Sequence, residues 1–145
     1  MSPIQQMLLG VGAVATKTYV DDVFSTYLWT GTGSNVTVNN GIDLSGKGGM
    51  VWHRIRAASS TSVEDTVRGL DKTLFTDEAN AEADAGAYGL QAFNNNGFTA
   101  GINSNGSEGV SWTFRKSPAF TICEWTGNGS NRTISHDLGS VPGMI

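Results

Sequence analysis

The sequence predicts a mainly β protein, folded as an antiparallel β-sandwich or jelly roll. Three observations favour this fold class. Charged residues make up only 15% of the 145-residue chain, and glycine occupies 19 positions. Short segments with a two-residue hydrophobic period recur along the chain, separated by turn-forming residues. The four Trp, six Phe and three Tyr provide enough apolar surface for the core of about one domain.

Composition also excludes several classes of protein. The net charge of −4 and the absence of Lys or Arg runs argue against a nucleic-acid-binding protein, which needs a basic face. A single cysteine, Cys123, excludes an intrachain disulfide, a Cys-rich zinc site and an iron–sulfur cluster. We therefore expect neither a cofactor nor a metal ion.

The chain begins with an apolar arm. Residues 7–15 are apolar and contain two glycines, but nine residues cannot cross a bilayer, which needs about twenty. No Lys or Arg precedes the run, so it is a poor signal peptide. The run also matches the dinucleotide-binding pattern G-x-G-x-x-A. The strand and acidic residue that this pattern requires are missing, so we interpret the match as coincidence.

Burying a large apolar side chain is worth about 1.5–3 kcal/mol. The arm should therefore fold back on its own domain or dock on another chain. Residues 17–26 follow with the spacing of a short helix that has one apolar face, with Asp21 and Asp22 near its start. The candidate attachment residues are the apolar side chains of both segments: Met7, Leu8, Leu9, Val11, Val14, Tyr19 and Phe24.

An internal repeat follows. Residues 29–38 and 125–134 align at an offset of 96 with seven identities in ten, and residues 49–51 align with 143–145. Duplication explains such an ordered match. Each copy predicts a strand ending in Trp, a Gly-x-Gly turn and a short second strand. The repeated strand-end and turn residues are Trp29, Gly31, Gly33, Trp125, Gly127 and Gly129.

The two copies continue differently. The first runs into a predicted strand at residues 50–56, whereas the second stops at Ile145, where its equivalent strand would begin. We therefore expect an N-terminal piece of a longer β protein. The predicted organisation is an arm and short helix over residues 1–26, a β-sandwich over 27–121 and a truncated second repeat over 122–145.

Further strands are predicted between the copies. Residues 94–97 carry an Asn-Gly hairpin signal, and Val110, Trp112 and Phe114 share one face of the clearest two-residue period. Residues 77–87 are expected to form a loop. The predicted strands are residues 73–76, 90–93, 98–102, 110–115 and 120–125.

A catalytic site is not expected, because the chain has no Gly-x-Ser-x-Gly elbow, Walker A loop or His-Glu-x-x-His motif. His53 is predicted on a solvated strand face, His136 in a turn and Cys123 within a strand. Residues 77–84 are acidic and favour a solvated loop, with a calcium site as the alternative. Residues 65–69 and 115–116 are expected to form ion pairs across strands.

The four tryptophans lie on alternating apolar faces, which predicts core packing for Trp29, Trp52, Trp112 and Trp125. An exposed Trp beside polar donors would instead indicate stacking on sugar rings. A depolymerase would need two carboxylates facing each other across a groove. Nothing in the spacing selects such a pair from the available acids: Asp43, Glu64, Asp65 and Asp71.

Residues 125–145 resemble a repeated module in tail-fibre and other appendage proteins of bacteriophages, especially those of cyanobacterial and marine phages. Other segments are similar in the same order: residues 17–23, 40–44, 48–52, 65–69, 93–98 and 111–116. The resemblance implies a lectin-like β-sandwich, a virion location and self-association, commonly as a trimer. His53 departs from the pattern.

The leading hypothesis is a structural virion protein, the N-terminal part of a tail fibre. Its arm would dock on a tail adaptor, tube or nozzle protein, and the β domain would assemble the fibre as a homotrimer. A distal part would contact the host receptor, without nucleic-acid binding or membrane insertion. The alternative is a carbohydrate-binding module that recognises host surface glycans, and a depolymerase is a third hypothesis.

Overall fold

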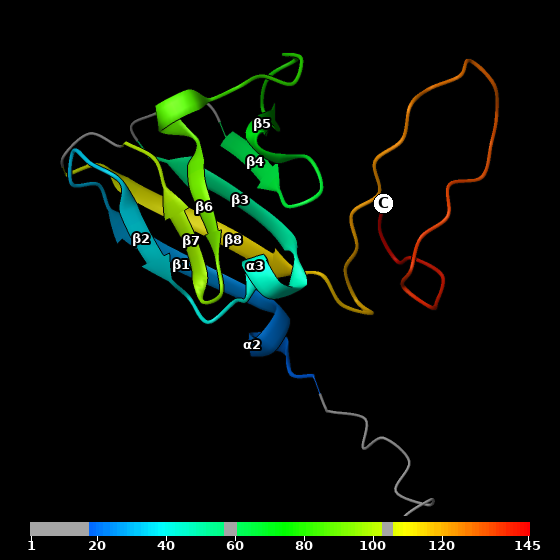
Figure 1. Cartoon of the computed structure of the whole chain (residues 1–145), viewed down its shortest axis with the longest axis horizontal. Coiled ribbons are helices and arrows are strands. Elements are labelled where there is room, and N and C mark those ends of the chain that lie inside the picture. The colour runs from blue at the N-terminus through cyan, green and yellow to red at the C-terminus, as the bar shows by residue number, and fades with distance from the viewer. Residues whose placement is uncertain (1–17, 57–60, 103–105) are drawn as a thin grey trace, which may run out of the picture.

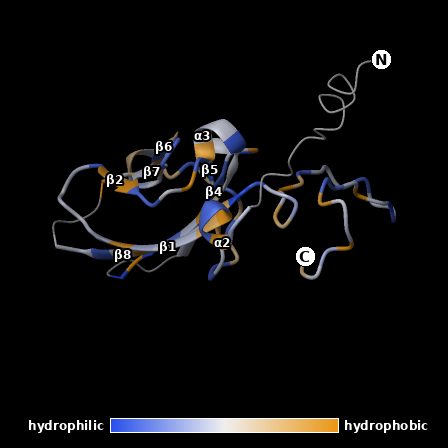
Figure 2. Ribbon diagram, turned by 90° about the horizontal axis from the view of Figure 1, so that it is seen from below, coloured by the Kyte–Doolittle hydropathy of each residue, from blue (hydrophilic) through white to orange (hydrophobic). Residues whose placement is uncertain are grey.

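The computed structural model describes residues 18–56, 61–102 and 106–145. Two antiparallel sheets face each other as a sandwich, which confirms the predicted fold class (Figures 1 and 2). One sheet has the strand order β1-β8-β3-β4-β5 and the other β2-β7-β6. The strands are β1 (Phe24–Thr30), β2 (Val36–Asn39), β3 (Gly49–Ile55), β4 (Thr61–Asp65), β5 (Gly69–Phe75), β6 (Leu90–Asn94), β7 (Gly97–Ala100) and β8 (Glu108–Arg115). Single helical turns are α2 (Val20–Val23), α3 (Leu44–Lys47) and η1 (Gly86–Tyr88).

The predicted N-terminal helix is only one turn long. Asp21 and Asp22 lie in the first turn of α2, and the Asp22 carboxylate accepts a hydrogen bond from the backbone N–H of Tyr19 at 2.8 Å. The chain becomes β1 at Phe24, because residues 24–30 pair along their whole length with β8. Tertiary pairing thus overrides the helical spacing of the last predicted residues.

Turn signals and alternation predicted most of the other strands but not β4. The Asn-Gly signal forms the tight β6–β7 hairpin, in which Asn94 pairs with Gly97. Gly97 has a φ of +132°, and a Cβ there would lie 2.1 Å from the carbonyl oxygen of Val38. The predicted strands at residues 50–56, 73–76, 90–93, 98–102 and 110–115 all lie within or overlap observed strands.

The core lies between the two sheets and is centred on Trp29. Its ring meets Phe98 of β7 edge-on at a centroid distance of 5.9 Å, so one aromatic contact joins the sheets. A Cβ at Gly109 of β8 would lie 2.3 Å from the Trp29 ring. The buried apolar side chains are Trp29, Val38, Ile42, Leu44, Val51, Leu90, Phe98 and Ala100.

The two faces of β8 are the reverse of what hydrophobicity favours. Gly109, Ser111 and Thr113 are buried, whereas the alternating residues Val110, Trp112 and Phe114 are half-buried. The Trp29 ring lies directly against Gly109, where a Cβ does not fit. The Thr113 hydroxyl also accepts a hydrogen bond from the Asn40 amide at 2.8 Å.

The prediction that all four tryptophans lie in the core is therefore wrong for three of them. Trp29 is buried, but Trp52 is 38% exposed and Trp125 is 60% exposed. Trp112 is half-buried on the outer face of the five-stranded sheet, opposite Trp52. Alternation fixes which residues share a face but does not say which face points inward.

Residues 120–125 do not form the predicted strand. Beyond β8, residues 116–145 contain only an isolated bridge between Ser117 and Phe120, and they form a long loop beside the sandwich (Figure 1). Phe120 stacks on Phe114 at a centroid distance of 5.2 Å. The first copy of the repeat, residues 29–38, forms strands because β8 and β7 pair with it. The second copy, residues 125–134, has no equivalent pairing among the described residues.

Gly109→Ala should lower the free energy of unfolding by about 1–3 kcal/mol, the usual cost of overpacking. The added methyl group would force the Trp29 ring off β8 and disturb its contact with Phe98. The control is Gly127→Ala, where a Cβ meets no atom within 4 Å. Urea unfolding followed by tryptophan fluorescence measures both. Equal stability of the two variants would contradict the proposed packing.

Candidate functional site on the outer face of the five-stranded sheet

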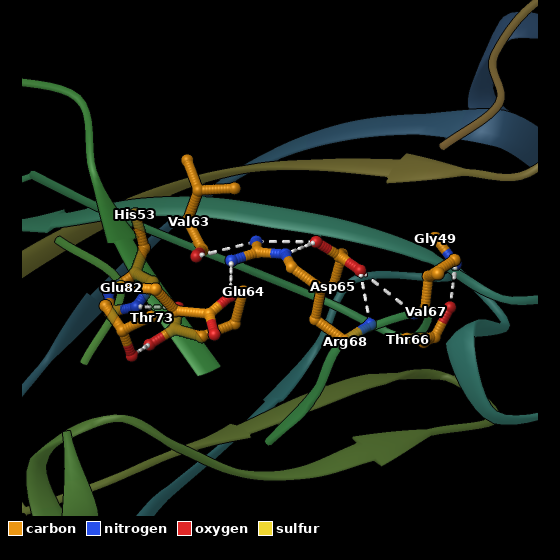
Figure 3. A network of polar contacts seen from close by, with 10 residues as sticks. All are labelled: Gly49, His53, Val63, Glu64, Asp65, Thr66, Val67, Arg68, Thr73 and Glu82. Carbon is orange, nitrogen blue, oxygen red and sulfur yellow. Dashed lines mark hydrogen bonds and ion pairs between the residues drawn. The ribbon is translucent and has the colours of Figure 1, made fainter. Parts of the chain in front are cut away.

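The interior of the sandwich holds a polar cluster that is structural. His53 is buried, not solvated as predicted, and its Nε2 lies 2.8 Å from Oε2 of Glu64. The other oxygen of Glu64 accepts a hydrogen bond from the Thr73 hydroxyl at 2.9 Å (Figure 3). Glu64 is fully buried, so these two partners offset the cost of removing its carboxylate from water.

A second polar contact stabilises the β4–β5 turn. The Asp65 carboxylate accepts hydrogen bonds from the backbone N–H groups of Val67 and Arg68, both at 2.9 Å, and from the Arg68 guanidinium (Figure 3). The predicted ion pairs between residues 65–69 and 115–116 are therefore wrong. Arg68 pairs within its own turn, and Lys116 pairs with Asp137 at 2.7 Å.

Acidic residues of the segment 77–84 form ion pairs with basic residues of the sheet and of the β4–β5 turn. Asp77 accepts a hydrogen bond from the backbone N–H of Thr61 and pairs with Arg54, and these contacts lower the pKa of Asp77. Lys72 and Arg68 likewise lower the pKa of Glu82. No group of three or more His, Cys, Asp or Glu side chains that could hold a metal ion occurs among the described residues.

The outer face of the five-stranded sheet carries the candidate site. Trp52 of β3 and Trp112 of β8 are directly opposite each other, with ring centroids 5.3 Å apart and ring planes inclined by 48°. Trp52 keeps 38% of its surface exposed. Because Phe114 contacts both Phe24 and Phe120, aromatic side chains continue along β8 from this pair.

A groove adjoins the tryptophan pair. On β3 and β8, the next outward residues are Arg54 and Val110, which are again directly opposite each other. They line an open groove of about 480 Å³ at the end of the sheet. The lining residues are Leu28, Trp29, Thr30, Arg54, Arg56, Glu108, Gly109 and Val110.

The charged side chains in the groove are paired. Arg54 donates to Asp77 at 3.1 Å and to the Thr61 hydroxyl at 2.7 Å, and Arg56 pairs with Glu108. Leu28 is 76% exposed and forms an apolar side of the groove with Val110. The site thus combines an exposed aromatic ring, an apolar wall and fixed polar groups, a combination typical of sites for small polar ligands.

The other predicted site residues are dispersed. Met7, Leu8, Leu9, Val11 and Val14 lie outside the described residues. Tyr19 is 62% exposed, and Phe24 contacts Phe114 at 4.9 Å. The second turn glycine of each repeat has a similar positive φ, +78° for Gly33 and +73° for Gly129.

Three further predicted residues have local structural roles. His136 accepts a hydrogen bond from the backbone N–H of Leu138 at 3.3 Å, as expected for a turn residue. Cys123 is not in a strand, and its thiol lies 3.5 Å from the carbonyl oxygen of Ser135. The Asp43 carboxylate caps α3 by accepting from the backbone N–H of Gly46 at 2.7 Å.

The fold and the site define a two-sheet β-sandwich with an aromatic and polar outer face. Residues 20–145 match the family described as a domain of unknown function (DUF7483), so the chain belongs to this family. No curated protein and no solved structure matches the chain. Among the described residues, no helix is both long enough and apolar enough to cross a membrane.

Glu64→Ala should destabilise the fold by about 3–5 kcal/mol, because it leaves His53 and Thr73 buried without their partner. Glu78→Ala is the control, since Glu78 is exposed and bonds to the nearby Asn80, which is also exposed. Thermal unfolding by circular dichroism compares the two variants. A similar melting temperature for both would show that the buried pair does not stabilise the sandwich.

Proposed function

We propose that the chain is a component of a bacteriophage tail fibre and that its β-sandwich binds carbohydrate on the host surface. The resemblance to phage appendage proteins supports the virion location. The outer face of the five-stranded sheet supports the binding role. The proposal combines the two hypotheses drawn from the sequence, a structural tail-fibre protein and a carbohydrate-binding module. One protein would both attach to the tail and recognise glycans.

The observation that carries the proposal is the exposed position of Trp52. A sugar ring stacks its C–H groups on the flat face of an indole, which presents a large apolar surface. Such a site also needs polar groups at the ring's edge, because sugar hydroxyls lose their hydration on binding. Trp112 extends the flat aromatic surface of Trp52. Arg54, the next outward residue on β3, provides a polar group beside it.

The proposed role is binding, not catalysis. A depolymerase would need two free carboxylates across a groove. Asp43, Glu64 and Asp65 are each engaged in a structural contact, as a helix cap, a buried pair and a turn. Glu108, which lines the groove, is paired with Arg56, and Asp77 is paired with Arg54.

Attachment to the tail is assigned to the N-terminal arm, including Met7, Leu8, Leu9, Val11 and Val14. Tyr19, which is 62% exposed, lies next to α2 and would extend the same docking surface. Self-association as a homotrimer is part of this proposal, because a fibre needs a repeating contact between chains. Analytical ultracentrifugation of the full chain gives the oligomeric state directly.

Trp52→Ala should weaken glycan binding at least tenfold, because it removes the exposed half of the aromatic pair. Trp125→Ala is the matched control, since Trp125 is 60% exposed but lies in the loop after β8. A glycan array identifies a ligand, and isothermal titration calorimetry measures its affinity for both variants. Equal losses in the two variants, or a loss only in Trp125→Ala, would contradict the proposed site.

Deletion of residues 2–16 should leave a folded β-sandwich that no longer enters phage particles. The described sandwich begins at β1, so its unfolding temperature should stay close to that of the full chain. Particle incorporation is measured by complementing a phage that lacks the protein and probing purified virions by immunoblotting. Normal incorporation of the deleted chain would show that the arm is not the attachment element.

A further inference from the structure

We infer that the outer face takes an electrically neutral oligosaccharide, which extends along the strands from the Trp52–Trp112 pair into the groove beside it. This inference rests on the proposed function and deepens it, because it names the chemical class and the path of the ligand. Three features support it. The tryptophan pair and the groove are continuous, the charged groups of the groove are paired, and apolar and polar side chains both line the groove.

The tryptophan pair and the groove form one continuous surface. Trp52 is opposite Trp112, and Arg54 is opposite Val110, so the two rows are successive outward positions of the same two strands. Two residues along a strand span roughly 6.6–6.8 Å. A chain of linked sugar rings that stacks on the indoles therefore reaches the groove with its next unit.

The charge balance of the groove favours a neutral ligand over an acidic one. Both basic residues that line it are neutralised, Arg54 by Asp77 at 3.1 Å and Arg56 by Glu108. A uronic or sialic acid carboxylate would have to compete with these carboxylates for the guanidinium groups. It would also be repelled by them at short range.

The same pairs provide the hydrogen bonds that neutral sugars need. A guanidinium has five N–H donors and a carboxylate has about four lone-pair sites, so each retains bonding capacity after the pair forms. The Arg56–Glu108 pair is well exposed, with side-chain exposures of 80% and 62%. The pair offers a donor and an acceptor close together to two neighbouring hydroxyls.

The apolar side of the groove, formed by Leu28 and Val110, also suits a sugar ring. Leu28 is 76% exposed and lies opposite Val110 in the pairing of β1 with β8. The equatorial hydroxyls of a sugar ring point sideways, which leaves patches of C–H groups on its faces. Leu28 and Val110 can contact such a patch while Arg56 and Glu108 bind the hydroxyls at its edge.

The test compares neutral and uronic-acid-containing oligosaccharides of equal length by calorimetry, with the full chain at 50 mM and 500 mM NaCl. The expected ligand is neutral, and its Kd should change less than about twofold between the two salt concentrations, because no net charge is screened. A wild-type preference for the acidic ligands, with a strong loss of affinity at high salt, would overturn the inference while leaving carbohydrate binding intact.

Two variants test the groove itself. Arg56→Met removes the donors and should weaken binding of the neutral ligand at least fivefold. Glu108→Gln keeps the shape but leaves Arg56 without its counter-charge, so binding of the acidic oligosaccharides should increase. If Trp52→Ala abolishes binding but neither groove variant changes it, the ligand does not enter the groove and the inference is wrong.

The proposed function and the inference about its ligand fail in distinguishable ways. If neither the neutral nor the acidic panel binds to the folded full chain, the proposed function and this inference both fail. If a second copy of the chain covers the face instead, sedimentation will show an oligomer that Trp52→Ala and Arg56→Met dissociate, and that result also overturns the inference. Thermal unfolding of each variant confirms that it is folded.

Discussion

The packing of Trp29 against Gly109 determines how the rest of the sandwich is arranged. The ring lies so close to β8 that no side chain fits at position 109, and its edge-on contact with Phe98 holds the second sheet in place. Once Gly109 faces inward, the two-residue period of the strand places Ser111 and Thr113 inside as well. Trp112 must then lie on the outer face, where it meets Trp52.

Features set by neighbouring residues could be predicted from the sequence. The Asn-Gly turn before Gly97, the positive φ at Gly33 and the aspartates at the start of α2 all depend on short-range preferences. Most strands were predicted from the alternating segments between turns, but β4 was not. The mainly β fold is therefore consistent with what short segments of the chain already indicate.

Features set by long-range contacts could not be predicted. Nothing near His53 identifies Glu64 as its partner, because the two meet only when β3 and β4 pair. Alternation in β8 showed that Trp112 shares a face with Phe114 but not that this face points outward. Residues 120–125 have a good strand pattern, yet they do not form a strand without neighbours to complete their hydrogen bonds.

The candidate site exists because β8 turns its small residues inward and Trp112 outward. The outer surface carries an indole pair of which Trp52 is exposed and Trp112 half-buried, and exposed apolar patches mark interaction sites. Paired charges beside the indoles make the surface polar without giving it a net charge. We infer that this combination suits a ligand that is apolar on one face and rich in hydroxyl groups at its edge.

The most direct test of this account is a heteronuclear NMR titration of the four indole N–H signals with the neutral oligosaccharide that binds best. We expect the signals of Trp52 and Trp112 to shift together and to saturate with the calorimetric Kd, whereas the signal of Trp125, which lies in the loop after β8, should stay unchanged. Shifts confined to Trp125, or no shift at Trp52 while binding is saturated, would show that carbohydrate does not bind to the outer face of the sheet.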